Sequence, residues 1–339
     1  MKKFLKVLCI VLVVLLAAYV ILGTLEHPQN YTEQNPMLST DGLPILIAHG
    51  GGNLEFPDNT LEAYYNAYSV DKNVIMESDV SITKDGVIIL SHDTTLDRKT
   101  NVTGNIIDWN YTDLIEQRVD FGYTNPVDDD SLLAGDRVHF TAEDGTERYP
   151  IDVEYPEGVE PRDEEIFYAT TLEEMLVAFP ENRISVEIKQ SGETGMAALR
   201  EVIRLLDEYD AFDRVVVASF HEEIFEEFQR LQQEDEVPDC FLCSPAQNSV
   251  TKFFVTQLLN ADSFYTDRIA VFQIPTSASI LNLASSGLIE KAHSHNLAVH
   301  YWTIDDEETM RELIEIGADG IETNYPHKLA AILDEYRVA

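Results

Sequence analysis

The feature that most constrains the fold is a regular alternation of short apolar runs with longer amphipathic segments between residues 184 and 336. Short apolar runs bounded by turn residues are typical of buried strands, and the longer segments are typical of helices. We therefore predict strands at Ile184–Ile188, Val215–Ser219, Cys240–Cys243, Ala270–Ile274, Ala298–Trp302 and Gly320–Thr323. The predicted helices are Gly195–Tyr209, Glu222–Gln233, Val250–Leu259, Ser279–His295, Glu307–Ile316 and His327–Tyr336. This alternation predicts a mostly parallel sheet covered by helices.

A similar pattern precedes this region. It predicts strands at Pro44–His49, Val74–Asp79 and Val87–Ser91, a helix at Thr60–Val70 and a short helix near 112–118. Asn59 stands directly before the first helix, where an N-cap is expected. Residues 123–168 are acidic and rich in turn residues, so we interpret them as an insertion with a hairpin turn at Asp144-Gly145. Without it, 44–339 have about 250 residues, the usual size of a (β/α)8 TIM barrel.

The N-terminus carries a continuous apolar run, Val7–Leu22, which Phe4 and Leu5 extend and three lysines precede. A run of this length is at the short end of what can span a bilayer. A cleaved signal peptide is the alternative, but it requires a small-x-small cleavage site, and the residues around Gly23 offer no good one. We therefore favour an uncleaved transmembrane helix.

This interpretation divides the chain into an anchor at 1–25, a polar linker at 26–43 and a catalytic domain at 44–339. Membrane contact is expected through residues 4–23. Because the lysines should stay in the cytoplasm, the catalytic domain is predicted on the extracytoplasmic side.

The chain beyond the anchor is strongly acidic. The whole chain has 23 Lys and Arg against 61 Asp and Glu, and three of the lysines lie before residue 26. Such a surface repels nucleic acid and anionic headgroups, so nucleic acid is excluded as a partner. Nothing in the sequence indicates an oligomeric state.

Two cysteines, Cys240 and Cys243, form a C-x-x-C pair. We favour a chance pair of small buried residues, with a disulfide as the alternative. A four-ligand zinc site is excluded because the chain has no second pair.

Residues suited to acid–base and metal chemistry follow several predicted strands. His49 and His92 each come directly after an apolar run, while Glu77 and Asp79 end a third and Glu187 lies near the end of another. In a (β/α)8 barrel the carboxyl ends of the strands meet at one face, where such enzymes carry out their chemistry. Imidazoles titrate near neutral pH, and carboxylates suit hard divalent cations. We therefore predict metal-assisted acid–base catalysis.

Several ordered motifs make the sequence similar to a known family. They are Ala48-His49-Gly50-Gly51, Pro57-Asp58-Asn59-Thr60, Glu77-Ser78-Asp79-Val80, Thr83-Lys84-Asp85-Gly86, His92-Asp93, Leu96-Asp97-Arg98-Lys99-Thr100, Thr103-Gly104, Thr171-Leu172-Glu173-Glu174, Glu187-Ile188-Lys189, Tyr301-Trp302-Thr303-Ile304 and Gly317-Ala318-Asp319-Gly320-Ile321. Together they resemble the glycerophosphodiester phosphodiesterase family over residues 45–326. That family folds as a TIM barrel.

The resemblance implies hydrolysis of a glycerophosphodiester to glycerol phosphate and an alcohol. It implies a divalent cation, Ca²⁺ or Mg²⁺, on Glu77, Asp79 and Glu187. His49 and His92 match the family's general acid and base. In the family the substrate's glycerol hydroxyl attacks phosphorus, and water opens the resulting cyclic phosphate.

Two further residues match the family's substrate pocket. Lys189 matches a lysine beside the phosphate, with a structural salt bridge as the alternative. Trp302 matches an aromatic residue of the pocket wall, with core packing as the alternative. Lipid-derived glycerophosphodiesters, lysophospholipids and glycerol phosphate polymers are all compatible substrates for a membrane-tethered enzyme.

The sequence departs from the family in the first motif, where Gly50 replaces an arginine that would bind phosphate. We hypothesise that backbone N–H groups of the glycine run, Gly50 and Gly51 among them, bind the phosphate instead. Asn324 stands where the family has aspartate, and we expect it to act at the entry of the last helix.

Two other functions compete with this interpretation. His49-Gly50-Gly51-Gly52 also resembles the oxyanion-hole motif of esterases, but the G-x-S-x-G nucleophile elbow that this fold needs is missing. A catalytically weakened barrel acting as a surface binding protein is the second alternative, and Gly50 is its support.

Overall fold

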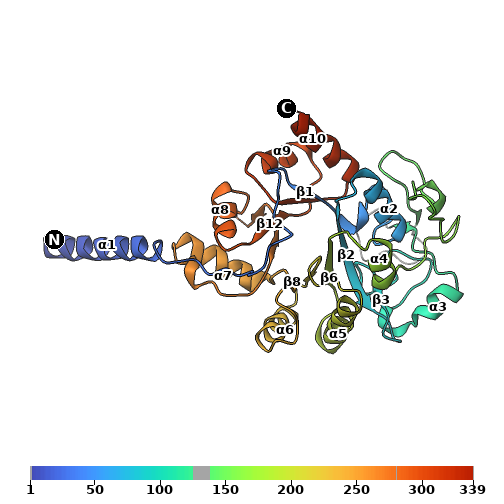
Figure 1. Ribbon diagram of the computed structural model, residues 1–339, viewed down its shortest axis with the longest axis horizontal. Coiled ribbons are helices and arrows are strands. Elements are labelled where there is room, and N and C mark those ends of the chain that lie inside the picture. Colours follow the sequence, from blue (N-terminus) through green and yellow to red (C-terminus); the bar gives the residue numbers. More distant parts are fainter. Residues whose placement is uncertain (1, 125–137, 280, 339) are drawn as a thin grey trace.

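The computed structural model describes residues 2–124, 138–279 and 281–338. Eight parallel strands curl into a nearly closed barrel, which confirms the predicted TIM-barrel fold (Figure 1). Their spatial order is β8 (Leu242–Cys243), β7 (Val215–Ala218), β6 (Ile184–Ile188), β2 (Ile75–Ile82), β1 (Ile45–Ala48), β13 (Gly320–Thr323), β12 (Ala298–Tyr301) and β9 (Val271–Ile274). A hydrogen bond from the Ala270 N–H to the Cys243 carbonyl (2.9 Å) joins the two ends of this order. Cys243 is buried, and Cys240 and Cys243 are both free thiols.

Helices follow the strands and cover the outside of the barrel (Figure 1). They are α2 (Leu61–Val70), α4 (Leu172–Ala178), α5 (Gly192–Glu208), α6 (Glu222–Gln233), α7 (Gln247–Leu258), α8 (Ser286–Ser294), α9 (Glu307–Glu315) and α10 (Pro326–Val338). The prediction missed α4 and began α8 seven residues too early. Residues before α8 instead form a small hairpin of β10 (Ser277–Ala278) and β11 (Leu281–Asn282), and Ser285 caps the helix by accepting from the Leu288 N–H.

The strand β2 is longer than predicted and has two parts. Residues 76–80 pair in parallel with β6, and residues 80–82 pair in an antiparallel way with β3 (Ile88–Leu90). The predicted strand Val87–Ser91 is therefore a hairpin partner outside the barrel order. The sequence had indicated that Glu77 and Asp79 lie at the end of a strand. In the structure they lie within β2.

The helix α3 (Tyr111–Glu116) precedes the insertion. Within the insertion, two short strands, β4 (Tyr123–Thr124) and β5 (Val138–His139), pair with each other. The predicted Asp-Gly turn is present, with the Ala142 N–H donating to the Thr146 carbonyl (2.9 Å). Residues 125–137 of the predicted insertion lie outside the described residues. The Arg148 guanidinium stacks over the Phe56 ring at 5.6 Å, so the insertion packs on the loop after β1.

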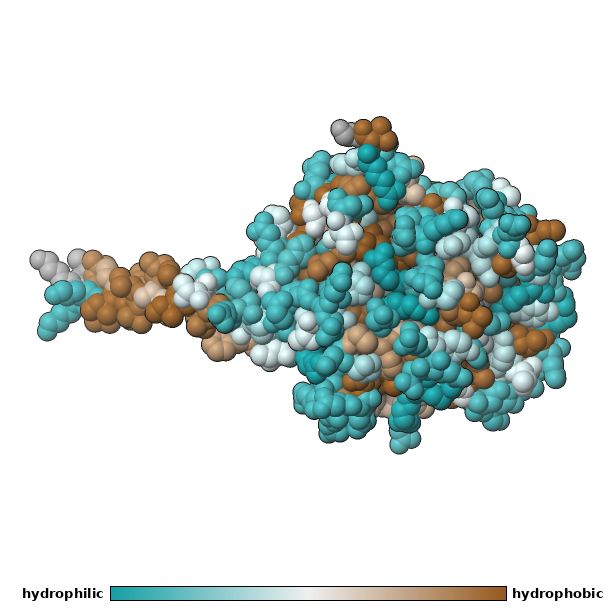
Figure 2. All heavy atoms as spheres, viewed as in Figure 1, coloured by the Kyte–Doolittle hydropathy of each residue, from teal (hydrophilic) through white to brown (hydrophobic). Residues whose placement is uncertain are grey.

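The helix α1 (Lys2–Leu22) projects from the barrel as an apolar rod (Figures 1 and 2). Lys3–Leu22 has a mean hydropathy of 3.0 and is exposed along its length. It is long and apolar enough to cross a membrane, which is a property that signal sequences near an N-terminus share.

Residues 26–43, predicted as a linker, instead pack in part against the amino ends of the barrel strands. The Asn35 amide donates to the carbonyls of Ala270 (2.7 Å) and Asn296 (2.8 Å). Met37 is fully buried, and its carbonyl accepts from His300 Nε2 at 2.9 Å. The polar side chains that suggested a solvated linker thus satisfy backbone groups of the barrel.

Candidate active site

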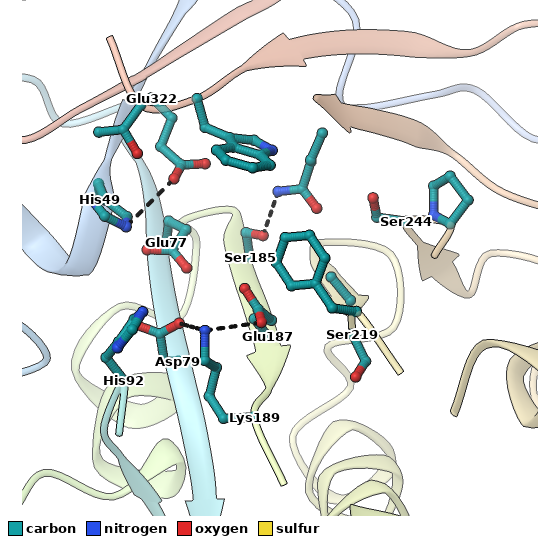
Figure 3. A pocket seen from close by; sticks show the side chains of 16 residues that line it. His49, Glu77, Asp79, His92, Ser185, Glu187, Lys189, Ser219, Ser244 and Glu322 are labelled. Atoms are coloured by element: carbon teal, nitrogen blue, oxygen red, sulfur yellow. Dashed lines mark hydrogen bonds and ion pairs between the residues drawn. The ribbon is translucent and has the colours of Figure 1, made fainter. Parts of the chain in front are cut away.

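A cavity of about 240 Å³ opens at the carboxyl ends of the barrel strands (Figure 3). It contains every predicted catalytic and metal-binding side chain as well as Lys189 and Trp302. Its lining residues are His49, Glu77, Asp79, His92, Ser185, Glu187, Lys189, Ala218, Ser219, Phe220, Ser244, Pro245, Gln273, Trp302, Thr303 and Glu322. The described part of the insertion contributes none of them.

Strand register brings the carboxylates together. Glu77 and Asp79 are two residues apart on β2, so their side chains leave the same face. Asp79 lies directly beside Glu187 of β6, and Glu322 of β13 enters from the other side next to β1. Glu322 was not predicted as a site residue, although a carboxylate near the end of a predicted strand was a signal that could have revealed it.

Asn59 holds Asp79 in place. Its amide donates to Asp79 Oδ2, and its Oδ1 accepts from the Asp79 N–H, both at 3.0 Å. This geometry requires a left-handed backbone at Asn59, with φ 59°, which asparagine tolerates better than most residues. The prediction that Asn59 caps α2 is wrong, because Thr60 is the cap and accepts from the Ala63 N–H at 3.2 Å.

Lys189 lies between two of these carboxylates. Its Nζ is 3.0 Å from Glu187 Oε1 and 3.4 Å from Asp79 Oδ1 (Figure 3). Among the described residues that line the cavity, it is the one lysine or arginine facing four carboxylates. The structure thus has the salt bridge that the sequence left as an alternative, and Nζ still faces the cavity.

The four carboxylates of the cavity have more negative charge than Lys189 can balance. Burial raises the pKa of Glu77 well above its ordinary value, and the charge of Asp79 raises it further. Burial likewise raises the pKa of Glu187, and it raises that of Glu322, where Glu77 adds repulsion. A bound cation would relieve this repulsion, so the site fits a divalent metal.

The geometry also offers a metal site that the sequence did not predict. Ligand atoms of His49, Glu77 and Glu322 all lie within 4.8 Å of one another. The predicted set of Glu77, Asp79 and Glu187 is not among the groups of described residues that meet that limit, and Lys189 Nζ contacts both Asp79 and Glu187.

His49 is held by an amide. Its Nδ1 is 2.6 Å from Asn324 Oδ1, while Asn324 Nδ2 donates to Asp305 Oδ2 at 2.7 Å. Because that second bond fixes the amide, Asn324 Oδ1 must accept, and we assign the proton to His49 Nδ1. Nε2 is then free to accept a proton, 3.9 Å from Glu322 Oε1. Asn324 therefore orients a site residue and is more than a helix-entry residue.

His92 is held by a carboxylate. Its Nδ1 is 2.9 Å from Asp93 Oδ1, and Asp93 Oδ2 accepts from Arg98 Nε at 2.6 Å. The hydrogen bond from Asp93 raises the pKa of His92, against the opposing effect of burial. His92 therefore favours the imidazolium form more than a free histidine does, with half of its side chain exposed.

Comparison with known proteins decides which family this arrangement belongs to. The family model described as the glycerophosphoryl diester phosphodiesterase family matches residues 49–328. The chain belongs to this family. The enzyme class predicted from the sequence, a phosphoric diester hydrolase, is thereby confirmed.

Curated relatives and solved structures agree with the family. The chain is 25% identical to lysophospholipase D GDPD1 of Rattus norvegicus, over 85% of each chain. It is 23% identical to a glycerophosphodiester phosphodiesterase of Bacillus altitudinis, over 86% of this chain and 99% of the relative. Its fold resembles an Oleispira antarctica phosphodiesterase solved with the product sn-glycerol-3-phosphate, with a TM-score of 0.58, 18% identity and coverage of 86% and 97%.

The departure from the glycerophosphoryl diester phosphodiesterase family at Gly50 has a structural explanation. Gly50 has φ +55°, and a Cβ there would come within 2.9 Å of Asp58 Cβ. Asp58 occupies this place with Lys99 and Arg98 as ion-pair partners. The proposed anion nest is not supported, because the Gly50 N–H donates to Glu77 Oε2 (2.8 Å), and neither Gly50 nor Gly51 lines the cavity.

The opposite wall of the cavity is apolar. Trp302 and Phe220 meet edge to face, with ring centroids 5.9 Å apart, and Phe220 remains exposed at the mouth. Gln273 donates to Ser185 Oγ at 2.8 Å and fixes the base of this wall. The cavity thus joins a charged half to an apolar half, and sequence reasoning found only Trp302 of the latter.

Proposed function

We propose that the chain hydrolyses glycerophosphodiesters to glycerol phosphate and an alcohol, with His49 as general base and His92 as general acid. The observation that carries this proposal is the difference between their partners. Asn324 accepts from His49 Nδ1 and leaves Nε2 as an acceptor, whereas Asp93 is anionic and favours a protonated His92. Burial lowers the pKa of His49, but the charge of Glu322 and the hydrogen bond with Asn324 raise it above its ordinary value, so His49 would act as base once a cation offsets the Glu322 charge. An acid and a base that line the same cavity as one carboxylate cluster are what phosphodiester cleavage needs.

In the proposed mechanism, His49 Nε2 takes the proton of the glycerol hydroxyl that attacks phosphorus, and His92 gives a proton to the departing alcohol oxygen, which leaves a cyclic glycerol phosphate. Water then opens this ring: His92 takes a proton from the water, and His49 returns its proton to the released glycerol oxygen, which gives glycerol phosphate. Lys189 moves from its carboxylate partners towards a phosphate oxygen. Glu77, Asp79 and Glu187 would hold the cation, Ca²⁺ or Mg²⁺, with Glu322 close by. When bound, that cation offsets negative charge on the phosphate and lowers the pKa of the attacking hydroxyl.

The relatives guide the choice of substrates. One is a lysophospholipase D and another a glycerophosphodiester phosphodiesterase, and the exposed Phe220 beside Trp302 offers an apolar surface at the cavity mouth. We propose lipid-derived glycerophosphodiesters and lysophospholipids as the substrate classes. The helix α1 would act as a membrane anchor that leaves the barrel on the extracytoplasmic side.

The test is a substrate panel on the full chain in detergent, with Ca²⁺, Mg²⁺ or a chelator, and phosphorus NMR to identify products. We expect metal-dependent release of glycerol phosphate or lysophosphatidic acid, lost in a His49→Ala/His92→Ala double variant. A chain that binds the metal but cleaves none of these diesters would overturn the proposal in favour of a surface binding protein. Protease accessibility of the barrel on intact cells tests its side of the membrane.

A further inference from the structure

A second group of metal-ligating side chains lies far from the cavity, at the side of the barrel from which α1 departs (Figure 1). It combines three separate segments. His27 follows α1, Asp262 begins the short helix η4 (Asp262–Phe264) after α7, and His295 ends α8. Asp262 and His295 are fully buried, and His27 is half-buried.

The three side chains converge on one point. His27 Nδ1 is 2.9 Å and His295 Nε2 is 3.2 Å from the same oxygen, Asp262 Oδ2. All three ligand atoms lie within 4.8 Å of one another. His27 Nδ1 is inaccessible to solvent and yet makes no hydrogen bond of acceptable geometry.

The proton on His295 is assigned by its neighbour Asn30. The Asn30 amide nitrogen donates to the carbonyls of Tyr265 (3.1 Å) and Asp267 (2.8 Å), so its Oδ1 must accept from His295 Nδ1 at 2.7 Å. In the neutral imidazole, Nε2 then carries a lone pair and faces a carboxylate oxygen.

The outer contacts are those of a metal site. Histidine ligands of metals donate their other ring N–H to a neighbouring oxygen, as His295 does to Asn30. Lys291 Nζ lies 3.3 Å from Asp262 Oδ1 and 3.4 Å from Oδ2, and Oδ2 is the oxygen that both imidazoles also face. Two imidazoles and one carboxylate, with water as the fourth ligand, suit Zn²⁺ and do not suit Ca²⁺ or Mg²⁺.

We propose that His27 Nδ1, His295 Nε2 and Asp262 Oδ2 bind one Zn²⁺, which fastens the segment after α1 to the barrel. His27 is five residues past the end of α1, so the ion would determine how the barrel is held relative to that helix. The site is independent of catalysis, because none of its ligands lines the cavity.

The experiment uses the full chain in detergent with Glu77→Gln, which weakens metal binding in the cavity. After dialysis against Zn²⁺ alone, we expect one zinc per chain by elemental analysis, and Co²⁺ substitution should give the visible absorption of a tetrahedral site. His27→Ala and His295→Ala should each weaken Zn²⁺ binding by at least tenfold. Zn²⁺ should also slow proteolysis of residues 24–31 in the parent and not in His27→Ala.

The matched control is His293→Ala, which removes an imidazole two residues from His295 on the same helix. His293 pairs with Asp319 at 2.8 Å and should be dispensable for Zn²⁺ binding. His27→Ala alters a half-buried residue outside the barrel, so it should fold even if His295→Ala does not. Unchanged Zn²⁺ binding in both His27→Ala and His295→Ala would overturn the proposal. A parent protein that binds no Zn²⁺, with the two histidines forming imidazolium ion pairs to Asp262, would overturn it as well.

Discussion

Two groups of histidines and carboxylates in this protein have similar geometry and opposite surroundings. In each, the ligand atoms of three side chains lie within 4.8 Å of one another. The first, His49 with Glu77 and Glu322, lines an open cavity and has further carboxylates around it. The second, His27 with Asp262 and His295, is enclosed, and Lys291 and Asn30 contact its outer atoms.

The difference separates a site built for chemistry from one built for structure. The cavity leaves room for a substrate beside its ligands, as catalytic metal sites do, whereas the second group is enclosed by protein atoms and leaves a fourth position for water alone. At the cavity, Lys189 pairs with two of the four carboxylates, and the four repel one another, so the arrangement costs stability until a cation binds. At the second group, each carboxylate oxygen faces a basic side chain.

Removing an imidazole should abolish activity only at the cavity. We expect His92→Ala and His49→Ala each to lower kcat by about 10²–10⁴-fold, because each loses a proton-transfer step. Neither should lower the midpoint of thermal unfolding. His293→Ala is the control, and its kcat should match that of the parent. If either cavity variant kept the parent's kcat, the role assigned to that histidine would be wrong.

Removing the carboxylate of the enclosed group should act on stability alone. Asp262→Ala leaves Lys291 without its buried ion-pair partner, which should cost about 3–5 kcal/mol of unfolding free energy. The measurement is chemical denaturation with chelator present, so that zinc binding does not contribute. We expect the kcat of the folded fraction to be unchanged. A loss below 1 kcal/mol, on the order of a surface substitution, would contradict the contrast.

Replacing Gly50 by the arginine that the family has at this position should not improve catalysis. Gly50→Arg places a side chain at φ +55°, which costs about 1–2 kcal/mol, and its Cβ would displace Asp58 from Lys99 and Arg98. We expect lower stability and no gain in kcat/KM. The control is Gly42→Arg, at φ +81° with open space around it, which should show the backbone cost alone. A Gly50→Arg variant with raised kcat/KM would show that the missing arginine limits the enzyme.

Neutralising a cavity carboxylate should stabilise the metal-free protein. Burial first, and then the charge of Glu77, raise the pKa of Glu322, so the native state holds this proton more tightly than the unfolded state does. Its contribution to stability is therefore present below about pH 4.3, the pKa of unfolded glutamate, and is lost as pH rises. We expect Glu322→Gln to gain on the order of 1 kcal/mol at pH 7 and less at pH 5.

The matched substitution at the amino end is Asp319→Asn. Asp319 accepts from the N–H groups of Ser39 and Val299 and pairs with His293, so its loss should lower stability. We measure the change in unfolding free energy by chemical denaturation with a chelator present. A gain for Glu322→Gln together with a loss for Asp319→Asn would support the contrast, and changes of the same sign would contradict it.

Much of the site could be predicted because it depends on local patterns. The segment predicted as Glu222–Gln233 matches α6 at both ends, and the residues predicted to be catalytic or metal-binding all line one cavity. Glu322, Asn324 and the role of Asn59 were missed. Their importance depends on neighbours distant in sequence, since Asn324 meets His49 across 275 residues.

Burial periods and strand-end motifs are local properties of the chain, and they were enough to predict the barrel, the family and the chemical types of the cavity residues. The partner of each imidazole depends instead on contacts that form only in the folded barrel. The pairing of β1 with β13 places Glu322 and Asn324 beside His49, and the folding of residues 26–43 onto the barrel places His27 beside Asp262. These contacts join segments that are far apart in the chain, so no local pattern encodes them.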